Sequence, residues 1–342
     1  MSGATDLVSL MTCETVVMET PARVATSRMV IMVLAPFRWA GVRLRNRLRR
    51  DPTWQEAFPL VAVLCVGLTT VDVSQQVAEF PAPGDKVQSG GAHVAPGGPA
   101  ANAATAVAAL GHRAVLLTAL GRDAFGAFAA AGLAERGVEF HDLAPDSRIS
   151  LSMVAVRERD GERTVISRNA AEVSLAATVD VVTPFVFQAD VVLLDGHLGP
   201  LALAVATAAK DAGLQVVLDA GSWKPVLEDL LPLVDVAACS SAFGPTEDEL
   251  HARGVPLVIR TNGPNPVTWS SDGELHERPV PVVQVRDTNG AGDVWHGALA
   301  VALARHDPVA EAVGWANAVA AVRVRNTAQD WVEELARWQD SR

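Results

Sequence analysis

Residues 287–293 read Asp-Thr-Asn-Gly-Ala-Gly-Asp and run directly into an apolar, helix-like stretch over residues 294–304. A turn of small residues that opens a helix presents N–H groups without intrahelical partners, and the helix dipole adds positive potential there. Such a turn binds an anion such as phosphate. A carboxylate at Asp293 would repel that anion unless it accepts a proton from an attacking hydroxyl. The segment therefore favours phosphoryl transfer to an alcohol, with Asp293 as general base and an anion site at Gly290, Ala291 and Gly292.

The elements that must position this turn alternate between strand-like and helix-like stretches from residue 59 onward. Residues 60–67, 190–194 and 214–219 are apolar runs typical of buried parallel strands, so we expect an α/β fold with a doubly wound, mostly parallel sheet flanked by helices. Residues 84–96 and 151–167 are extended and interrupt the alternation. They predict a small β-sheet lid, which would keep water from the transferred phosphate.

Composition agrees with a globular enzyme. The chain has 342 residues, of which 49% are hydrophobic, and its net charge of −11 disfavours a nucleic-acid partner, which is bound with clustered lysine and arginine. The three cysteines, Cys13, Cys65 and Cys239, show no metal-ligand spacing. Reduced thiols and a cytoplasmic location are the simplest expectation.

Residues 1–57 differ from the rest, with eight arginines against five acidic residues. Their apolar stretch is far shorter than the roughly 20 residues of a membrane span. We interpret this segment as a poorly ordered N-terminal extension. The alternative is a basic amphipathic helix that binds a membrane surface or a partner.

Two further motifs accompany the turn, Gly-Gly-Pro-Ala-Ala-Asn at residues 97–102 and Leu-Gly-Arg-Asp-Ala-Phe-Gly at residues 120–126. Together the three motifs, over roughly residues 60–325, resemble the ribokinase-like (PfkB-type) carbohydrate kinases. Residues 195–197 (Asp-Gly-His) and 219–224 (Asp-Ala-Gly-Ser-Trp-Lys) resemble the branch of ketohexokinase-like and sulfofructose-kinase-like bacterial enzymes.

The resemblance implies a ribokinase-like kinase domain over residues 58–330, followed by a C-terminal helix or tail at 331–342. It implies ATP-dependent phosphorylation of a sugar or sugar derivative, with ATP and Mg²⁺ as cofactors, and it allows a monovalent cation in addition. It also implies a homodimer formed through the lid, without nucleic-acid partners or a membrane span.

The resemblance assigns sugar contacts to residues that are unremarkable by themselves. Asp72 follows the first strand and could equally be a turn residue, and a glycine pair before a helix could be ordinary capping. Asn169, after the second lid segment, could meet a substrate group or face water. The predicted substrate-binding residues are Asp72, Gly98, Asn102 and Asn169.

For the nucleotide, the resemblance points to a lysine after a strand, a Thr-x-Gly turn and a helix beside the adenine. Each also has an ordinary structural interpretation, as a turn cap or as close helix packing. The predicted ATP-binding residues are Lys224, Thr261, Gly263 and Asn317.

One departure from the family pattern concerns the metal. Ser241 stands where relatives carry an acidic residue of the magnesium and phosphate network, so the metal ligands are unknown from sequence. Glu247, Asp248 or Glu249 could compensate through water, although such a cluster more often begins an exposed helix.

Two alternatives remain open at this stage. A nucleoside kinase of the same fold would require an apolar or aromatic platform for the base, and the lid shows no obvious aromatic cluster. A non-catalytic sugar- or nucleotide-binding regulator is favoured by Ser241 and disfavoured by Asp293.

Overall fold

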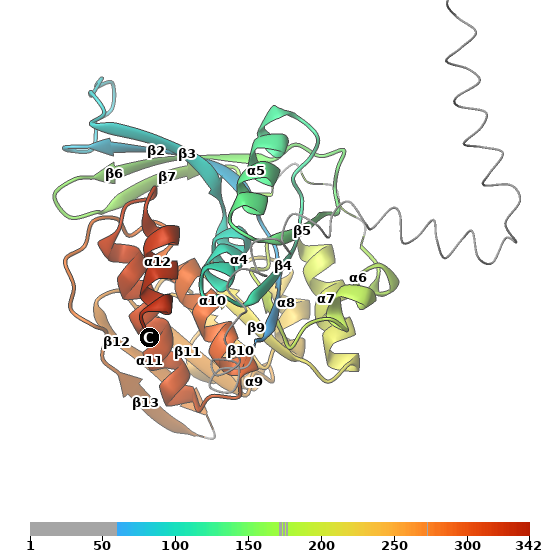
Figure 1. Cartoon of the computed structure of the whole chain (residues 1–342). Helices are drawn as coiled ribbons and strands as arrows, with labels where there is room; N and C mark the ends of the chain where they lie inside the picture. The colour runs from blue at the N-terminus through green and yellow to red at the C-terminus, as the bar shows by residue number, and fades with distance from the viewer. Residues whose placement is uncertain (1–59, 171–172, 174, 176, 272) are drawn as a thin grey trace, which may run out of the picture. The chain divides into compact units, whose positions relative to one another are not determined.

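The computed structural model describes residues 60–342, except 171, 172, 174, 176 and 272. The predictions for residues 1–57 lie outside these residues. The predicted α/β fold is confirmed (Figure 1).

The main sheet has the strand order β13-β12-β11-β10-β9-β8-β1-β4-β5. The strands from β11 to β5 run parallel, and β12 and β13 add an antiparallel edge. In chain order the strands are β1 (Ala62–Val66), β4 (Arg113–Thr118), β5 (Glu139–Asp142), β8 (Val191–Leu194), β9 (Gln215–Ala220), β10 (Val236–Cys239), β11 (Leu257–Asn262), β12 (Asn265–Ser271) and β13 (Glu274–Arg278).

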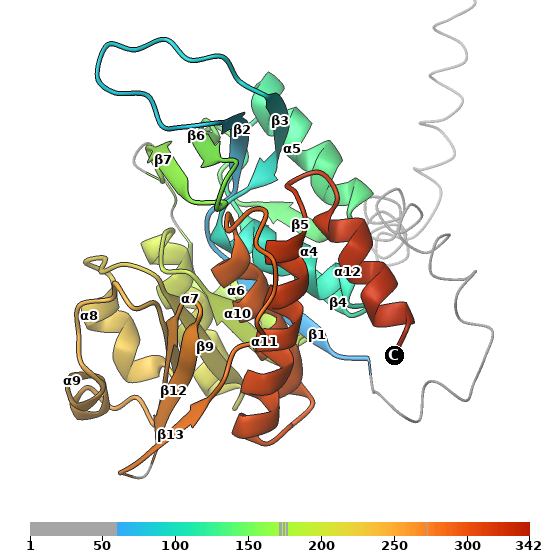
Figure 2. The same ribbon diagram turned by 90° about the vertical axis from the view of Figure 1, so that its left-hand side faces the viewer.

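Helices cover both faces of this sheet (Figures 1 and 2). Side chains of β1 alternate between two hydrophobic cores, Val63 and Cys65 in one and Leu64 and Val66 in the other. The first core includes residues of α4 (Pro99–Ala109), α5 (Ala124–Glu135), α10 (Ala291–Ala304), α11 (Val309–Arg325) and α12 (Trp331–Asp340). The second includes residues of α6 (Val179–Val186), α7 (Gly199–Asp211), α8 (Leu227–Leu230) and α9 (Glu247–Ala252).

The strand order reverses beside β1, because the chain first adds β4 on one side and later β8 on the other. Ligands of open parallel sheets bind at such a switch point, beyond the carboxyl ends of the strands. Asp195, directly after β8, ties this region together because its Oδ2 accepts the N–H groups of Leu68 at 2.7 Å and Ala100 at 3.3 Å. The start of α4 is thereby fixed next to the end of β1.

A second, four-stranded sheet forms the lid, in the order β3-β2-β6-β7 (Figure 1, upper part). Its strands are β2 (Thr70–Val77), β3 (Gly91–Gly97), β6 (Ser150–Arg157) and β7 (Arg163–Ser167). Strand β2, which sequence analysis did not assign to the lid, pairs with β3 and β6. Asp72 therefore lies within a lid strand rather than on a loop after β1.

The register divides the lid into two faces. Asp72 is paired with Ala95 and Ser152, whereas Val73 is paired with Val94 and Met153. Since neighbouring residues of a strand point to opposite faces, the row that contains Asp72 and the row that contains Val73 lie on opposite sides of the lid sheet.

Within the described residues, no helix combines the length and the apolar character that crossing a membrane requires.

Candidate active site

The turn before α10 is held in place by its first aspartate. Asp287 is buried, and its Oδ1 accepts the N–H of Asn289 at 2.8 Å. Gly290 then adopts a left-handed conformation, with φ of 70°, at the N-cap of α10. Glycine takes this conformation without steric cost, so it suits this sharp entry into the helix.

The predicted anion site, Gly290, Ala291 and Gly292, lies at this helix entry. The N–H of Ala291 donates to Thr288 O at 3.3 Å. By contrast, a Cβ atom added at Gly292 would meet no atom within 4 Å, so the turn is open on that side. The arrangement lets an anion approach the first N–H groups of the helix.

Asp293 is half-buried in the first turn of α10, where its Oδ2 accepts a hydrogen bond from Asn102 Nδ2 at 2.8 Å. Burial and the negative charge of Asp219 raise the pKa of Asp293 to about 6, although the Asn102 hydrogen bond and the charges of His296 and Arg163 oppose this. A carboxylate with this pKa is ionised near neutral pH yet basic enough to accept a proton.

A buried ion pair lies next to Asp293. His296 is one helical turn further along α10, and its Nδ1 is 3.1 Å from Asp219 Oδ2 at the end of β9. Burial disfavours the imidazolium, but Asp219 outweighs that effect and raises the pKa of His296. In turn, His296 lowers the pKa of Asp219 against its own burial. Asp219 is thus paired with His296, whereas Asp293 forms no ion pair with a side chain of the described residues.

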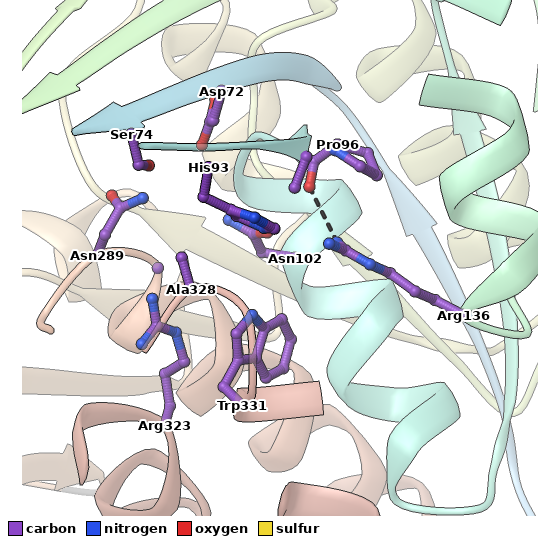
Figure 3. A pocket seen from close by; sticks show the side chains of 12 residues that line it. Asp72, Ser74, His93, Pro96, Asn102, Arg136, Asn289, Arg323, Ala328 and Trp331 are labelled. Carbon is purple, nitrogen blue, oxygen red and sulfur yellow. Dashed lines mark hydrogen bonds between the residues drawn. The ribbon is translucent and has the colours of Figure 1, made fainter. Parts of the chain in front are cut away.

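A pocket borders Asn102 and Gly290 (Figure 3). The lid supplies its Asp72, Ser74 and His93 side chains, and Trp331 at the start of α12 lies opposite them in the view. The structure thus brings three predicted residues, Asp72, Asn102 and Gly290, to one cavity.

Asp72 is fixed tightly within this pocket. Its Oδ1 accepts a hydrogen bond from Thr70 Oγ1 at 2.5 Å, and a Cβ added at Gly97 would lie 2.2 Å from its Oδ2. Burial raises the pKa of Asp72, opposed by hydrogen bonds from Thr70, Ser152 and Asn289 and by the charge of Arg136. A carboxylate in this position can accept hydrogen bonds from the hydroxyls of a sugar.

The two other predicted sugar residues differ in placement. Gly98 precedes α4 with φ of 93°, and a Cβ there would lie 2.6 Å from Leu68 O, so glycine is required for this close approach. Asn169 is exposed after β7, and its carbonyl accepts a hydrogen bond from Ser150 Oγ. It does not line the pocket that contains Asp72.

Three of the predicted nucleotide residues follow or end strands of the main sheet. Lys224 lies after β9, and its Nζ donates to Ser222 O at 3.2 Å. Thr261 Oγ1 donates to Cys239 O at 3.3 Å, and Gly263 forms the turn between β11 and β12. These positions share the carboxyl edge of the sheet with Asp219, where a parallel sheet binds its ligands.

Asn317, which is predicted to bind ATP, makes side-chain contacts within the protein. The side chain is buried, where its Oδ1 accepts from Trp295 Nε1 at 2.8 Å and its Nδ2 donates to Pro279 O at 3.2 Å. These bonds join α11 to α10 and to the segment after β13. Its amide is thus engaged within the protein.

Two of the three acidic residues that follow Ser241 are already engaged. Glu247 Oε1 accepts from Arg260 Nε at 2.7 Å, and Glu249 completes a capping box with Thr246 at the start of α9. Within the part of the chain that the structure describes, no group of three His, Cys, Asp or Glu side chains could hold a metal ion.

Several side chains near the site were not predicted. Arg163, at the start of β7, donates to Thr288 O at 2.6 Å, and Thr288 Oγ1 donates to Gly161 O at 2.9 Å, so the lid hairpin contacts the turn. His296 could have been found from its spacing of three residues from Asp293 on one helix face. The pocket is also lined by His93, Arg136 and Trp331, which come from separate elements. No pattern in the sequence around these residues indicates a binding site.

Comparisons with known proteins find carbohydrate kinases that match most of the chain. The profile described as pfkB family carbohydrate kinase matches residues 62–330. A ribokinase of Arabidopsis thaliana is 27% identical over 304 residues, covering 82% of this chain and 79% of the relative. A ribokinase of Haemophilus influenzae is 26% identical over 282 residues, covering 76% and 90%.

Solved structures share the fold. A provisionally assigned ribokinase from Agrobacterium tumefaciens superposes with a TM-score of 0.70 at 29% identity, covering 83% of this chain and 99% of the other. Arabidopsis thaliana ribokinase, solved in complex with ribose and ATP, gives a TM-score of 0.65 at 24% identity and covers 81% and 99%.

Proposed function

The chain belongs to the pfkB family of carbohydrate kinases, and from this premise we propose that it phosphorylates a small monosaccharide held between Asp72 and Asn102, with Asp293 as general base. ATP-dependent phosphorylation of a sugar is the activity that the family match and the ribokinase relatives give. The residue assignment is supported by one observation: Asn102 lines the sugar pocket and also donates a hydrogen bond to Asp293.

The proposed mechanism uses few groups. Asp293 accepts the proton of the substrate hydroxyl. Asn102 lies in α4 at the wall of the pocket, and its hydrogen bond orients the Asp293 carboxylate. The helix entry at Gly290, Ala291 and Gly292 stabilises the charge of the transferred phosphoryl group. Positioning and electrostatic stabilisation are the main requirements of phosphoryl transfer.

We place ATP at the carboxyl edge of the main sheet, with Lys224 and the Thr261 and Gly263 turn near its phosphates. Asn317 supports this region as a structural residue through Trp295. Mg²⁺ fits this site as an ion carried by the ATP phosphates and water, because it needs only one or two protein oxygens. It would neutralise charge on the phosphates.

The substrate is proposed to be a pentose such as ribose. The named relatives are ribokinases, which favours this choice over the ketohexokinase-like and sulfofructose-kinase-like branch that residues 195–197 and 219–224 resemble. Use of ATP favours a cytoplasmic location, as do the buried free thiols of Cys65 and Cys239.

A homodimer through the lid is also proposed. One row across the lid sheet, Val94, Val73, Met153 and Ile166, is apolar, and its face is opposite to that of Asp72. Met153 is 45% and Ile166 73% exposed, which is unusual for apolar side chains gathered on one sheet face. A second copy of this face would bury them.

The function is tested by measuring ADP release from ATP and Mg²⁺ with pentoses, hexoses, ketoses, phosphorylated and sulfonated sugars and nucleosides. Turnover with one sugar class, reduced about 10²- to 10⁴-fold in Asp293→Asn, is expected. The exposed Asp340→Asn variant is the control, because it removes the same charge at the end of α12.

Two results would contradict the proposal. Nearly unchanged turnover of Asp293→Asn would show that another group accepts the proton. No turnover with any compound, while sugar or ATP still raises the melting temperature, would favour a binding protein without catalytic activity.

A further inference from the structure

A buried arginine lies directly behind the anion-binding turn. Arg323, in the last turn of α11, is 2% exposed, and its Nη2 donates to Asp287 Oδ2 at 2.8 Å. Its Nη1 donates to the carbonyls of Asp287 at 3.2 Å and Asn326 at 3.0 Å. Figure 3 shows its side chain at the edge of the sugar pocket, next to Ala328 and Trp331.

The acceptors of this guanidinium form a characteristic set. One carboxylate oxygen and two main-chain carbonyl oxygens converge on it, and such oxygens are the ligands of hard cations in proteins. The same oxygens cannot hold a metal ion while the guanidinium occupies them. The residues at this position therefore do not fit the monovalent cation that the family resemblance allows.

The position of this charge connects it with the turn. The other oxygen of Asp287 accepts the N–H of Asn289, two residues before Ala291. The N–H groups of Arg286 and Asp287 donate to Val324 O at 2.7 and 3.3 Å, so the end of α11 and the start of the turn are bound together. A change at Arg323 is transmitted through Asp287 to the residues that open α10.

Burying an ion pair does not by itself stabilise a fold, because the desolvation of both charges offsets their attraction. The positive charge of Arg323 instead affects the electrostatic potential at the turn. It neutralises Asp287, which would otherwise repel an anion at the turn, and it adds to the positive potential of the helix entry.

We propose that the Arg323 guanidinium is a built-in substitute for a bound monovalent cation, so that the kinase requires neither K⁺ nor Na⁺. Arg323 is then a positioning residue, which acts on the transferred phosphoryl group through Asp287 and the turn. This inference rests on the proposed sugar kinase function.

The first experiment uses the wild-type chain. Initial rates of sugar phosphorylation are measured with Mg²⁺ in buffers whose only monovalent cation is tetramethylammonium, and then with KCl or NaCl at constant ionic strength. We expect kcat and the KM for ATP to change less than about twofold, since no exchangeable cation contributes to the turn. An increase of about tenfold or more with K⁺ or Na⁺ would overturn the inference while leaving the kinase assignment intact.

The second experiment uses Arg323→Ala, with Arg325→Ala as the matched control. Arg325 is an exposed arginine two residues further along the same helix end. We expect Arg323→Ala to lose at least about tenfold in kcat and to regain part of it with K⁺ or guanidinium ions, whereas Arg325→Ala shows neither effect. Full activity of Arg323→Ala without added cation would overturn the inference.

A binding measurement separates the two proposals. The shift in melting temperature caused by ATP is compared with and without K⁺ in the wild-type chain. If no sugar is phosphorylated, the function proposal fails, but an ATP shift that is independent of K⁺ still supports the inference. A shift that requires K⁺ contradicts it.

Discussion

Asn102 Nδ2 lies 2.8 Å from Asp293 Oδ2, so a residue at the wall of the sugar pocket holds the proposed base directly. The two residues are 191 positions apart and come from α4 and α10. Substrate binding and proton transfer therefore share one hydrogen bond.

The first prediction concerns pH. Because the pKa of Asp293 is raised to about 6 and the base must be ionised, kcat/KM should fall as pH drops through about 6. The Asn102 hydrogen bond lowers this pKa, so Asn102→Ala should move the acid limb to higher pH. The measurement is the pH profile of kcat/KM for both proteins. An acid limb that stays in place in the variant would mean that a different group titrates.

The second prediction concerns Gly97 in β3. Gly97→Ala places a methyl group 2.2 Å from Asp72 Oδ2, so the carboxylate must move within the pocket. We expect the sugar KM to rise about tenfold to a hundredfold with little change in the KM for ATP. Gly91→Ala in the same strand is the control, because its methyl group would meet only Gln76 at 3.4 Å. Equal sugar KM values for the two variants would argue against Asp72 as a sugar ligand.

The third prediction concerns the contact between the lid and the turn. Arg163→Ala removes the 2.6 Å hydrogen bond to Thr288 O, so the lid hairpin should close less firmly over the phosphoryl group. We expect more ADP than sugar phosphate to form, because water then competes with the sugar. Arg159→Ala, on the same hairpin but bonded to Glu79, should keep the two products equal. Equal amounts of ADP and sugar phosphate in both variants would exclude this role of Arg163.

The fourth prediction concerns stability. Asn317→Ala leaves Trp295 Nε1 and Pro279 O without their partner, which should lower the free energy of unfolding by about 2 kcal/mol. Denaturant unfolding of Asn317→Ala, Trp295→Phe and the double variant should show that the two effects are not additive. A large rise in the KM for ATP at unchanged stability would instead support a direct nucleotide contact.

The fifth prediction concerns the outer face of the lid. Met153→Lys introduces a charge into the apolar row with Val73 and Ile166, and we expect it to shift a dimer to a monomer. Light scattering after size-exclusion chromatography measures the molar mass of each variant and so distinguishes dimer from monomer. Val87→Lys changes an exposed residue of the loop before β3 and serves as the control. A wild-type monomer at all concentrations would refute assembly through this face.

Much of the fold was accessible from sequence because its signals are local. Apolar runs such as residues 191–194 predict buried parallel strands, and the small-residue turn before Asp293 predicts a helix entry. Strand β2 is not evident from sequence, although Val71 and Val73 alternate with Asp72 and Ser74, because a position directly after β1 is equally consistent with a loop.

The remaining parts of the site depend on contacts between distant segments. Arg323 meets Asp287 across 36 positions, and nothing in its own helix distinguishes it from the exposed Arg325. The family resemblance assigns Asn317 to the nucleotide, and the packing of α11 against α10 directs its amide to Trp295. Such pairings are set by tertiary packing rather than by local pattern.

The register of β2 has a consequence for how this gene can vary. Asp72 serves the sugar pocket and Val73 the outer apolar face, although they are adjacent in sequence. An insertion or deletion of one residue within β2 would exchange the two faces and disturb both at once. Length changes should therefore be confined to the exposed loop over residues 78–90, while single substitutions can alter substrate preference and self-association separately.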